Sequence, residues 1–92
     1  MADDTRYVRS PHVLQRRTLD TFVLLAVDGE EPVIVGGTGA DVWTLLTEVR
    51  TVEQLVEVLA EHYAGDPGVI AADVRALLEA FVTAGVVLAA DG

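Results

Sequence analysis

The sequence predicts an α+β fold, in which a three-stranded antiparallel meander is followed by three helices. Before residue 36, short apolar runs are separated by turn residues, as is typical of strands joined by hairpins. From residue 38 onward, apolar residues recur at helical spacing. The two patterns meet in the stretch 31–49, EPVIVGGTGADVWTLLTEV, where a strand ends and the first helix begins.

One small domain is expected from the length and composition of the chain. It has 92 residues, of which 51% are hydrophobic, and this is enough for one core. Residues 1–10 are polar and aperiodic, which predicts a flexible N-terminal tail. Residues 11–92 contain the periodic segments and are expected to form the single domain.

Three strands are expected, over residues 12–17, 21–27 and 32–35. The second run, TFVLLAV, is apolar at both alternating sets of positions, which predicts a strand that is covered on both faces. Asp28 and Gly29 follow it and supply a hairpin turn. The third strand begins at Pro32, and proline is tolerated at the start of an edge strand, so this strand is expected at an exposed sheet edge.

The starts and ends of the three helices are marked by capping residues. Thr38, Thr51 and Asp66 are the expected N-caps, because their side-chain oxygens can accept hydrogen bonds from first-turn N–H groups. Gln54 completes a capping box with Thr51. Gly85 ends the third helix, and the apolar residues after it are expected to pack back on the core.

The third helix has an apolar sector wider than one buried face requires. Its core stripe consists of Ile70, Val74, Leu77, Phe81 and Ala84. Ala71, Leu78 and Val82 lie beside this stripe on one flank, and Arg75 borders the same flank. Either another part of the domain covers this flank, or a partner does.

Charge and composition exclude several classes of function. The net charge is −9, which opposes binding to a phosphate backbone. The absence of lysine excludes a P-loop or Schiff-base lysine, and the absence of cysteine excludes a disulfide, a thiolate nucleophile and a cysteine metal site. The N-terminus lacks the apolar region of a signal peptide, and no apolar run approaches the ~20 residues of a membrane span, so a cytoplasmic protein is expected.

The patterns that resemble catalytic or metal sites have simpler interpretations. Residues 36–39 are rich in glycine but lack the lysine of a phosphate loop, so they predict a strand-to-helix turn. His12 and His62 are far apart and have no ligand or catalytic partners nearby in sequence. Trp43 is expected in the core. A solvated face is expected for the glutamates that recur along the second helix, Glu53, Glu57 and Glu61. We therefore expect no catalytic residue, no cofactor and no metal.

The order of five segments resembles the PqqD-like family, over about residues 11–88. These segments are PHVLQRR, FVLLAV, VIVGGTGADVWTLL, RTVEQLVEVLAEHY and DVRALLEAFVTAGVV. Family members are small leader-peptide recognition domains of ribosomal peptide natural-product pathways. In one place the chain departs from the pattern: many members have a Leu-Asn pair after the third strand, where this chain has Val35-Gly36-Gly37.

The resemblance implies a winged-helix-like, non-enzymatic domain that binds the leader segment of a precursor peptide and delivers it to a modifying enzyme. The favoured pathway is lasso-peptide maturation, in which the partner is a cysteine protease. The first alternative is a peptide chaperone of pyrroloquinoline quinone biosynthesis, which serves a radical enzyme. A winged-helix DNA-binding regulator is a further alternative, opposed by the net charge and by the single arginine of the third helix. The last is a structural subunit of a larger assembly.

The resemblance also implies where the leader binds: it adds as a strand beside the third strand and lies against the third helix. This agrees with the expected open edge and the surplus apolar flank. The expected peptide-binding residues are Val33, Ile34, Val35, Ala71, Arg75, Leu78 and Val82. Arg75 is expected to pair with an acidic residue of the leader.

Overall fold

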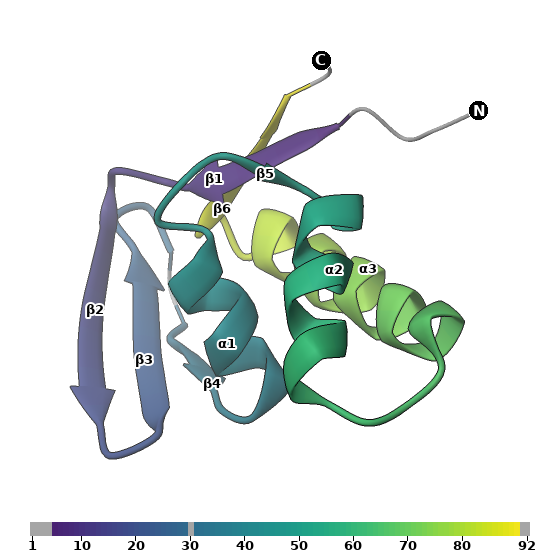
Figure 1. The fold of residues 1–92 in the computed structure, drawn as a ribbon. Helices are drawn as coiled ribbons and strands as arrows, with labels where there is room; N and C mark the ends of the chain where they lie inside the picture. The colour runs from purple at the N-terminus through teal and green to yellow at the C-terminus, as the bar shows by residue number, and fades with distance from the viewer. Residues whose placement is uncertain (1–4, 30, 91–92) are drawn as a thin grey trace.

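Two small antiparallel sheets and three helices make up the chain in the computed structural model, which describes residues 5–29 and 31–90 (Figure 1). In chain order the elements are β1 (Arg6–Arg9), β2 (Val13–Thr18), β3 (Thr21–Ala26), β4 (Val33–Val35), α1 (Thr38–Leu45), β5 (Arg50–Thr51), α2 (Val52–His62), α3 (Pro67–Thr83) and β6 (Val87–Ala90). The predicted α+β fold is confirmed, and so are the meander and the three helices.

The meander is the sheet β2-β3-β4, in which β4 pairs only with β3. The register places Val33 opposite Leu24 and Ile34 opposite Val23. Leu24 is fully buried, whereas Ile34, on the opposite face of the sheet, is 73% exposed. The prediction that the β3 segment is covered on both faces is therefore wrong, because the helices cover only one face of this sheet.

The second sheet has the order β5-β1-β6 and was not predicted. Its central strand is β1, which pairs antiparallel with both β5 and β6. The prediction of a flexible tail over residues 1–10 is thus wrong for residues 6–9, and residues 1–4 lie outside the described part. A short polar strand of this kind is stabilised by partners far along the chain, so local sequence patterns do not reveal it.

Most of the helix boundaries follow the predicted caps. Thr51 and Gln54 form the expected capping box at the start of α2, and the Asp66 carboxylate accepts from the Gly68 N–H at the start of α3. Gly85 follows the end of α3 with a positive φ of 79°, a conformation that favours glycine. Thr38 is the exception: α1 is preceded by Gly37, and Thr38 is its first helical residue instead of its cap.

Trp43 of α1 lies in the core and contacts residues of three other elements, α3, β2 and β1. It is 1% exposed and meets Phe81 of α3 edge-on, with ring centroids 6.3 Å apart. Its indole N–H donates to Gln15 Oε1 at 2.8 Å, and the Arg9 guanidinium lies 4.4 Å from the ring centroid. This arrangement confirms the predicted core role of Trp43, and it ties both sheets to α1.

Candidate functional site

The outer edge of β4 is the first component of the candidate site. β4 ends the sheet β2-β3-β4, so the edge that faces away from β3 carries no strand in the described structure. An unpaired edge presents backbone N–H and C=O groups that another extended segment can pair with. The predicted exposed edge at Val33–Val35 is confirmed by this topology.

A hollow of about 420 Å³ lies where β4 ends and α1 begins. Gly36, Thr38 and Gly39 form one wall, and the opposite wall is a single face of α3. The α3 residues of this wall are Asp73, Ala76, Leu77 and Ala80. Their spacing of three and four residues places them on one side of the helix, and the two alanines leave room beside the strand.

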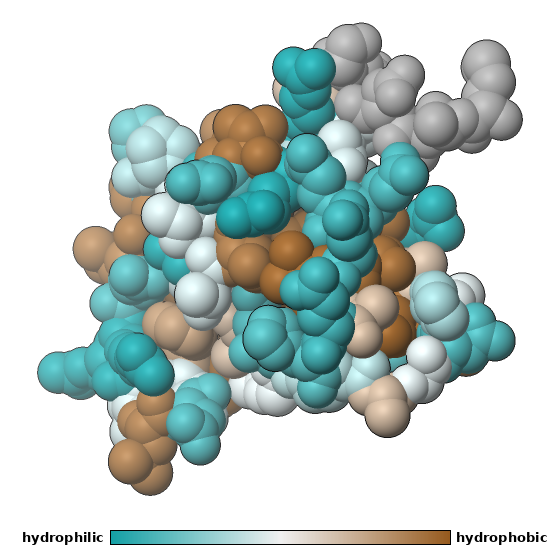
Figure 2. All heavy atoms as spheres, viewed as in Figure 1, coloured by the Kyte–Doolittle hydropathy of each residue, from teal (hydrophilic) through white to brown (hydrophobic). Residues whose placement is uncertain are grey.

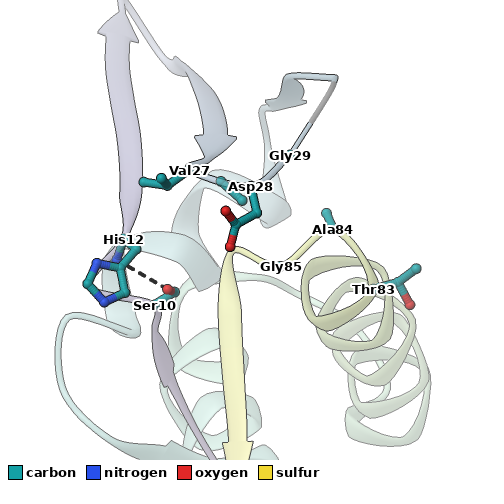
Figure 3. A pocket seen from close by; sticks show the side chains of 9 residues that line it. Ser10, His12, Val27, Asp28, Gly29, Thr83, Ala84 and Gly85 are labelled. Atoms are coloured by element: carbon teal, nitrogen blue, oxygen red, sulfur yellow. Dashed lines mark hydrogen bonds between the residues drawn. The ribbon is translucent and has the colours of Figure 1, made fainter.

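A second hollow, of about 370 Å³, lies between the turn that follows β3 and the end of α3 (Figure 3). Residues 26–29 of the hairpin line it together with residues 83–85 at the end of α3. Ser10 and His12 complete the lining. In Figure 3 the Asp28 carboxylate points from the hairpin toward the segment at Gly85.

The two hollows are separate and differ in their relation to β4. The residues just after β4 line the first hollow, whereas the second is lined by the turn after β3 and by Ser10 and His12, which precede β2. Only the first hollow therefore lies beside the end of β4. We call this first hollow, together with the open β4 edge, the β4–α3 groove.

Gly39 sets the close approach of the elements that form the groove floor. A Cβ on Gly39 would lie 2.9 Å from Val35 Cγ1 and 3.3 Å from Leu77 Cδ2, so only glycine fits here without displacement. Val35 is buried and Leu77 is half-buried. The strand, the start of α1 and α3 thus meet at this one position.

The α3 flank predicted from the sequence is not the flank that faces β4. Leu78 is 1% exposed and belongs to the core, so the prediction that it lies on an open flank is wrong. Ala71 is half-buried, Arg75 is exposed and Val82 is 40% exposed, but none of them lines either hollow. At about 100° per residue, positions 71, 75 and 82 lie across the helix from positions 73, 76 and 80.

Asp73, Ala76 and Ala80 are the groove residues that the sequence did not identify. Two of them are alanines, and alanine is the strongest helix former on any face of a helix, so its presence does not indicate which face is covered. A signal was present in their spacing with Leu77, since 73, 76, 77 and 80 form one stripe beside the core positions.

The ionisable groups with shifted pKa values lie outside the groove. The Tyr63 hydroxyl hydrogen-bonds the Asp41 carboxylate, and this bond, with burial, raises the pKa of Tyr63. Burial lowers the pKa of Arg9, whose Nε–H donates to the backbone oxygen of Trp43 at 2.9 Å. The first contact joins the end of α2 to α1, and the second joins β1 to α1, so both serve the packing of the fold.

Residues 5–29 and 31–90 contain neither a metal-binding cluster nor a membrane-spanning helix. No group of three or more histidine, aspartate or glutamate side chains in these ranges is placed to hold a metal ion. None of the helices found there has the length and apolar character needed to cross a bilayer.

Comparison with known proteins gives one family and two similar folds. The family model described as coenzyme PQQ synthesis protein D (PqqD) matches residues 21–87. The structure "TbiB1 in Complex with the TbiA(beta) Leader Peptide" is 24% identical, with a TM-score of 0.79 over 87% of this chain and 93% of the other. The structure "Lasso peptide synthetase B1 complexed with the leader peptide" is 20% identical, with a TM-score of 0.77 over 89% and 96%. No curated protein matches the chain. At these identities the two structures establish likeness of fold.

Proposed function

The chain belongs to the PqqD family, and from this membership we propose that it binds the leader segment of a ribosomally made precursor peptide and delivers it to a modifying enzyme. The proposed role is one of binding, with no catalytic step of its own. The predicted resemblance to this family is confirmed by the family model, which matches most of the chain.

Maturation of a lasso peptide is the pathway that we propose. Both similar structures are described as complexes with a leader peptide, and one of them is a lasso peptide synthetase B1. The partner enzyme would then be a protease that removes the leader. The family description favours one alternative, a peptide chaperone in the synthesis of coenzyme PQQ.

The observation that carries the proposal is the open edge of β4 beside the groove wall of α3. A leader in extended conformation can add to β4 as a further strand, with main-chain hydrogen bonds that do not depend on its sequence. Its alternate side chains would then enter the hollow at the end of β4, where Leu77, Ala76 and Ala80 provide apolar surface. Burial of one Leu- or Ile-sized side chain there contributes roughly 1.5–3 kcal/mol.

A titration with amide-exchange mapping tests the proposal. The probe is a synthetic, fluorescently labelled leader peptide, taken from any short precursor reading frame that neighbours this chain's gene, and its binding is followed by anisotropy. We expect saturable binding and slowed amide exchange in Val33–Val35, because new ladder hydrogen bonds protect backbone N–H groups. Absence of saturable binding, or protection confined to β2 or β6, would contradict the proposal.

A further inference from the structure

The middle residue of β4 lies on the face of the sheet β2-β3-β4 that the helices do not cover. Side chains alternate between the two faces of a strand, so Val33 and Val35 point toward the helices and Ile34 points away from them. Val35 is 4% exposed, whereas Ile34 is 73% exposed. Within β4, Ile34 is therefore the residue that offers a side chain on the outer face of the sheet.

The strand register places Ile34 at the end of a row of side chains that crosses this outer face. Ile34 lies opposite Val23 of β3, and Val23 lies opposite Arg16 of β2. Val23 is half-buried and Arg16 is exposed. The row therefore becomes more apolar toward β4 and ends at the open edge with the side chain of Ile34.

An exposed isoleucine at an open edge differs from the usual arrangement, in which charged side chains on edge strands discourage pairing with other chains. None of the three residues of β4 is charged. By contrast, the outward face of α2 is hydrophilic (Figure 2), and the exposed residues of this helix include Glu53, Glu57 and Glu61. The β4 edge thus lacks protection against an added strand, and Ile34 is placed to contact a side chain of that strand.

We propose that the β4–α3 groove selects peptides with a β-branched or aromatic residue at the position opposite Ile34. The inference rests on the proposed function and names the chemistry of one residue of the leader. In an added strand, the residue opposite Ile34 points to the same outer face, with its Cβ about 5 Å from the Cβ of the isoleucine. Pairs of β-branched and aromatic residues are favourable at this distance, because each covers apolar surface of the other.

A single position of the peptide should show this preference. Pro32 and Gly36 lie two residues from Ile34, just outside the strand. Glycine has no side chain and the compact proline ring has little reach, so neither offers a comparable contact. The peptide residues on either side of the selected one face the helices, where Ala76 and Ala80 line the hollow. Their preferences should therefore be independent of Ile34.

Selection from a random peptide library tests this inference and does not require the leader sequence. The immobilised protein is presented with phage that display randomised peptides of about twelve residues, longer than one strand. We compare the wild type with Ile34→Glu and Ile34→Lys. The matched controls, Leu14→Glu and Leu14→Lys, make the same changes on the same face of the sheet, but on its other edge strand, where the leucine is 66% exposed.

The wild type and both controls should enrich β-branched and aromatic residues about threefold at one position of the aligned peptides. Ile34→Glu should change the preference at that position to lysine and arginine, and Ile34→Lys should change it to aspartate and glutamate, because opposite charges pair favourably across strands. Circular dichroism checks the fold of each variant. If a charged variant does not fold, Ile34→Ser takes its place and should abolish the enrichment.

Two results would overturn the inference. One is a wild-type pool that has no such position, or whose preference the Ile34 variants leave unchanged. The other is a preference that follows the Leu14 variants instead, since the peptide would then add to β2.

One further variant separates failure of this inference from failure of the proposed function. Ala80→Trp fills the hollow at the end of β4 and should remove the enriched peptides from the bound pool. If Ala80→Trp removes peptides that the Ile34 variants retain, the groove binds peptides and only the inference about Ile34 fails. If the wild type enriches no peptide, or if Ala80→Trp and the Ile34 variants all retain the same peptides, the groove is not the binding site and both proposals fail.

Discussion

The two flanks of α3 differ in what they face, although both are partly exposed. One flank carries Asp73, Ala76 and Ala80 and forms a wall of the β4–α3 groove. The other carries Arg75 and Val82, which line neither hollow. The flank with Arg75 and Val82, which is the more apolar one in the sequence, is thus the flank that does not border the groove. Small residues beside an open strand edge make a better wall for an added peptide than larger apolar residues that face solvent.

The largest expected effect tests whether Leu78 belongs to the core or to an open flank. Leu78→Asp places a carboxylate where the leucine is 1% exposed. We expect it to reduce the free energy of unfolding by about 4 kcal/mol or more, because buried apolar volume is lost and an unpaired charge must be desolvated. Urea denaturation followed by circular dichroism measures the change.

Val82→Asp is the control for Leu78→Asp, since it lies one turn further along and is 40% exposed. It should leave the domain folded, with a loss below about 1 kcal/mol. Equal stability of the two variants would show that Leu78 faces solvent, and the comparison of the flanks would then fail.

The next largest effect tests which flank binds peptide. Ala80→Trp should weaken leader binding at least about tenfold, or ~1.4 kcal/mol, because the indole occupies the space that a leader side chain would enter. Val82→Trp introduces the same ring on the other flank and should change the dissociation constant less than about twofold. Anisotropy titrations of both variants measure the difference. If Val82→Trp proves the more harmful, the groove lies on the flank predicted from the sequence.

A smaller effect is expected at the point where β4, α1 and α3 meet. Gly39→Ala puts a Cβ 2.9 Å from Val35 Cγ1 and should destabilise the fold by about 1–3 kcal/mol through overpacking. Displacement of Leu77 should also lower leader affinity. Thermal unfolding and the leader titration measure the two effects.

Gly36→Ala is the matched control for this change, because its Cβ would lie no closer than 3.7 Å to Thr21 Oγ1. Its effect on stability should stay below about 0.5 kcal/mol. Similar losses for both glycine variants would show that backbone freedom, and not close approach at Gly39, explains them.

The smallest effect is expected at Arg75. Arg75→Ala should change leader affinity by less than about twofold, because the side chain is exposed and lies across α3 from the groove. A loss of about fivefold or more, larger than a rim pair normally gives, would instead support the acidic partner predicted from the sequence.

Individual residues show how far the sequence could predict the site. The edge position of Val33–Val35 was predictable, since Pro32 and the turn at Asp28 and Gly29 are local signals. The groove wall at Ala76 and Ala80 was not, because alanine favours a helix on any face and does not indicate which face is covered. Leu78 was misplaced because the width of an apolar sector does not indicate which of its borders is covered.

The sequence by itself determined where α2 begins and where α3 begins and ends. Thr51 with Gln54, Asp66 with Pro67, and Gly85 each satisfy or terminate backbone hydrogen bonds within one turn of the chain. Such signals are local, so a single sequence contains them in full.

Only the tertiary structure decided which side of α3 faces β4, and that residues 6–9 form a strand between β5 and β6. The rotation of α3 about its axis is set by contacts between distant residues, such as the approach of Val35 and Leu77 to Gly39. The pairing of β1 likewise depends on segments more than forty residues away. Helical periodicity shows which residues share a face of the helix, but not which part of the fold that face meets. Only these long-range contacts therefore decide which flank of α3 borders the groove.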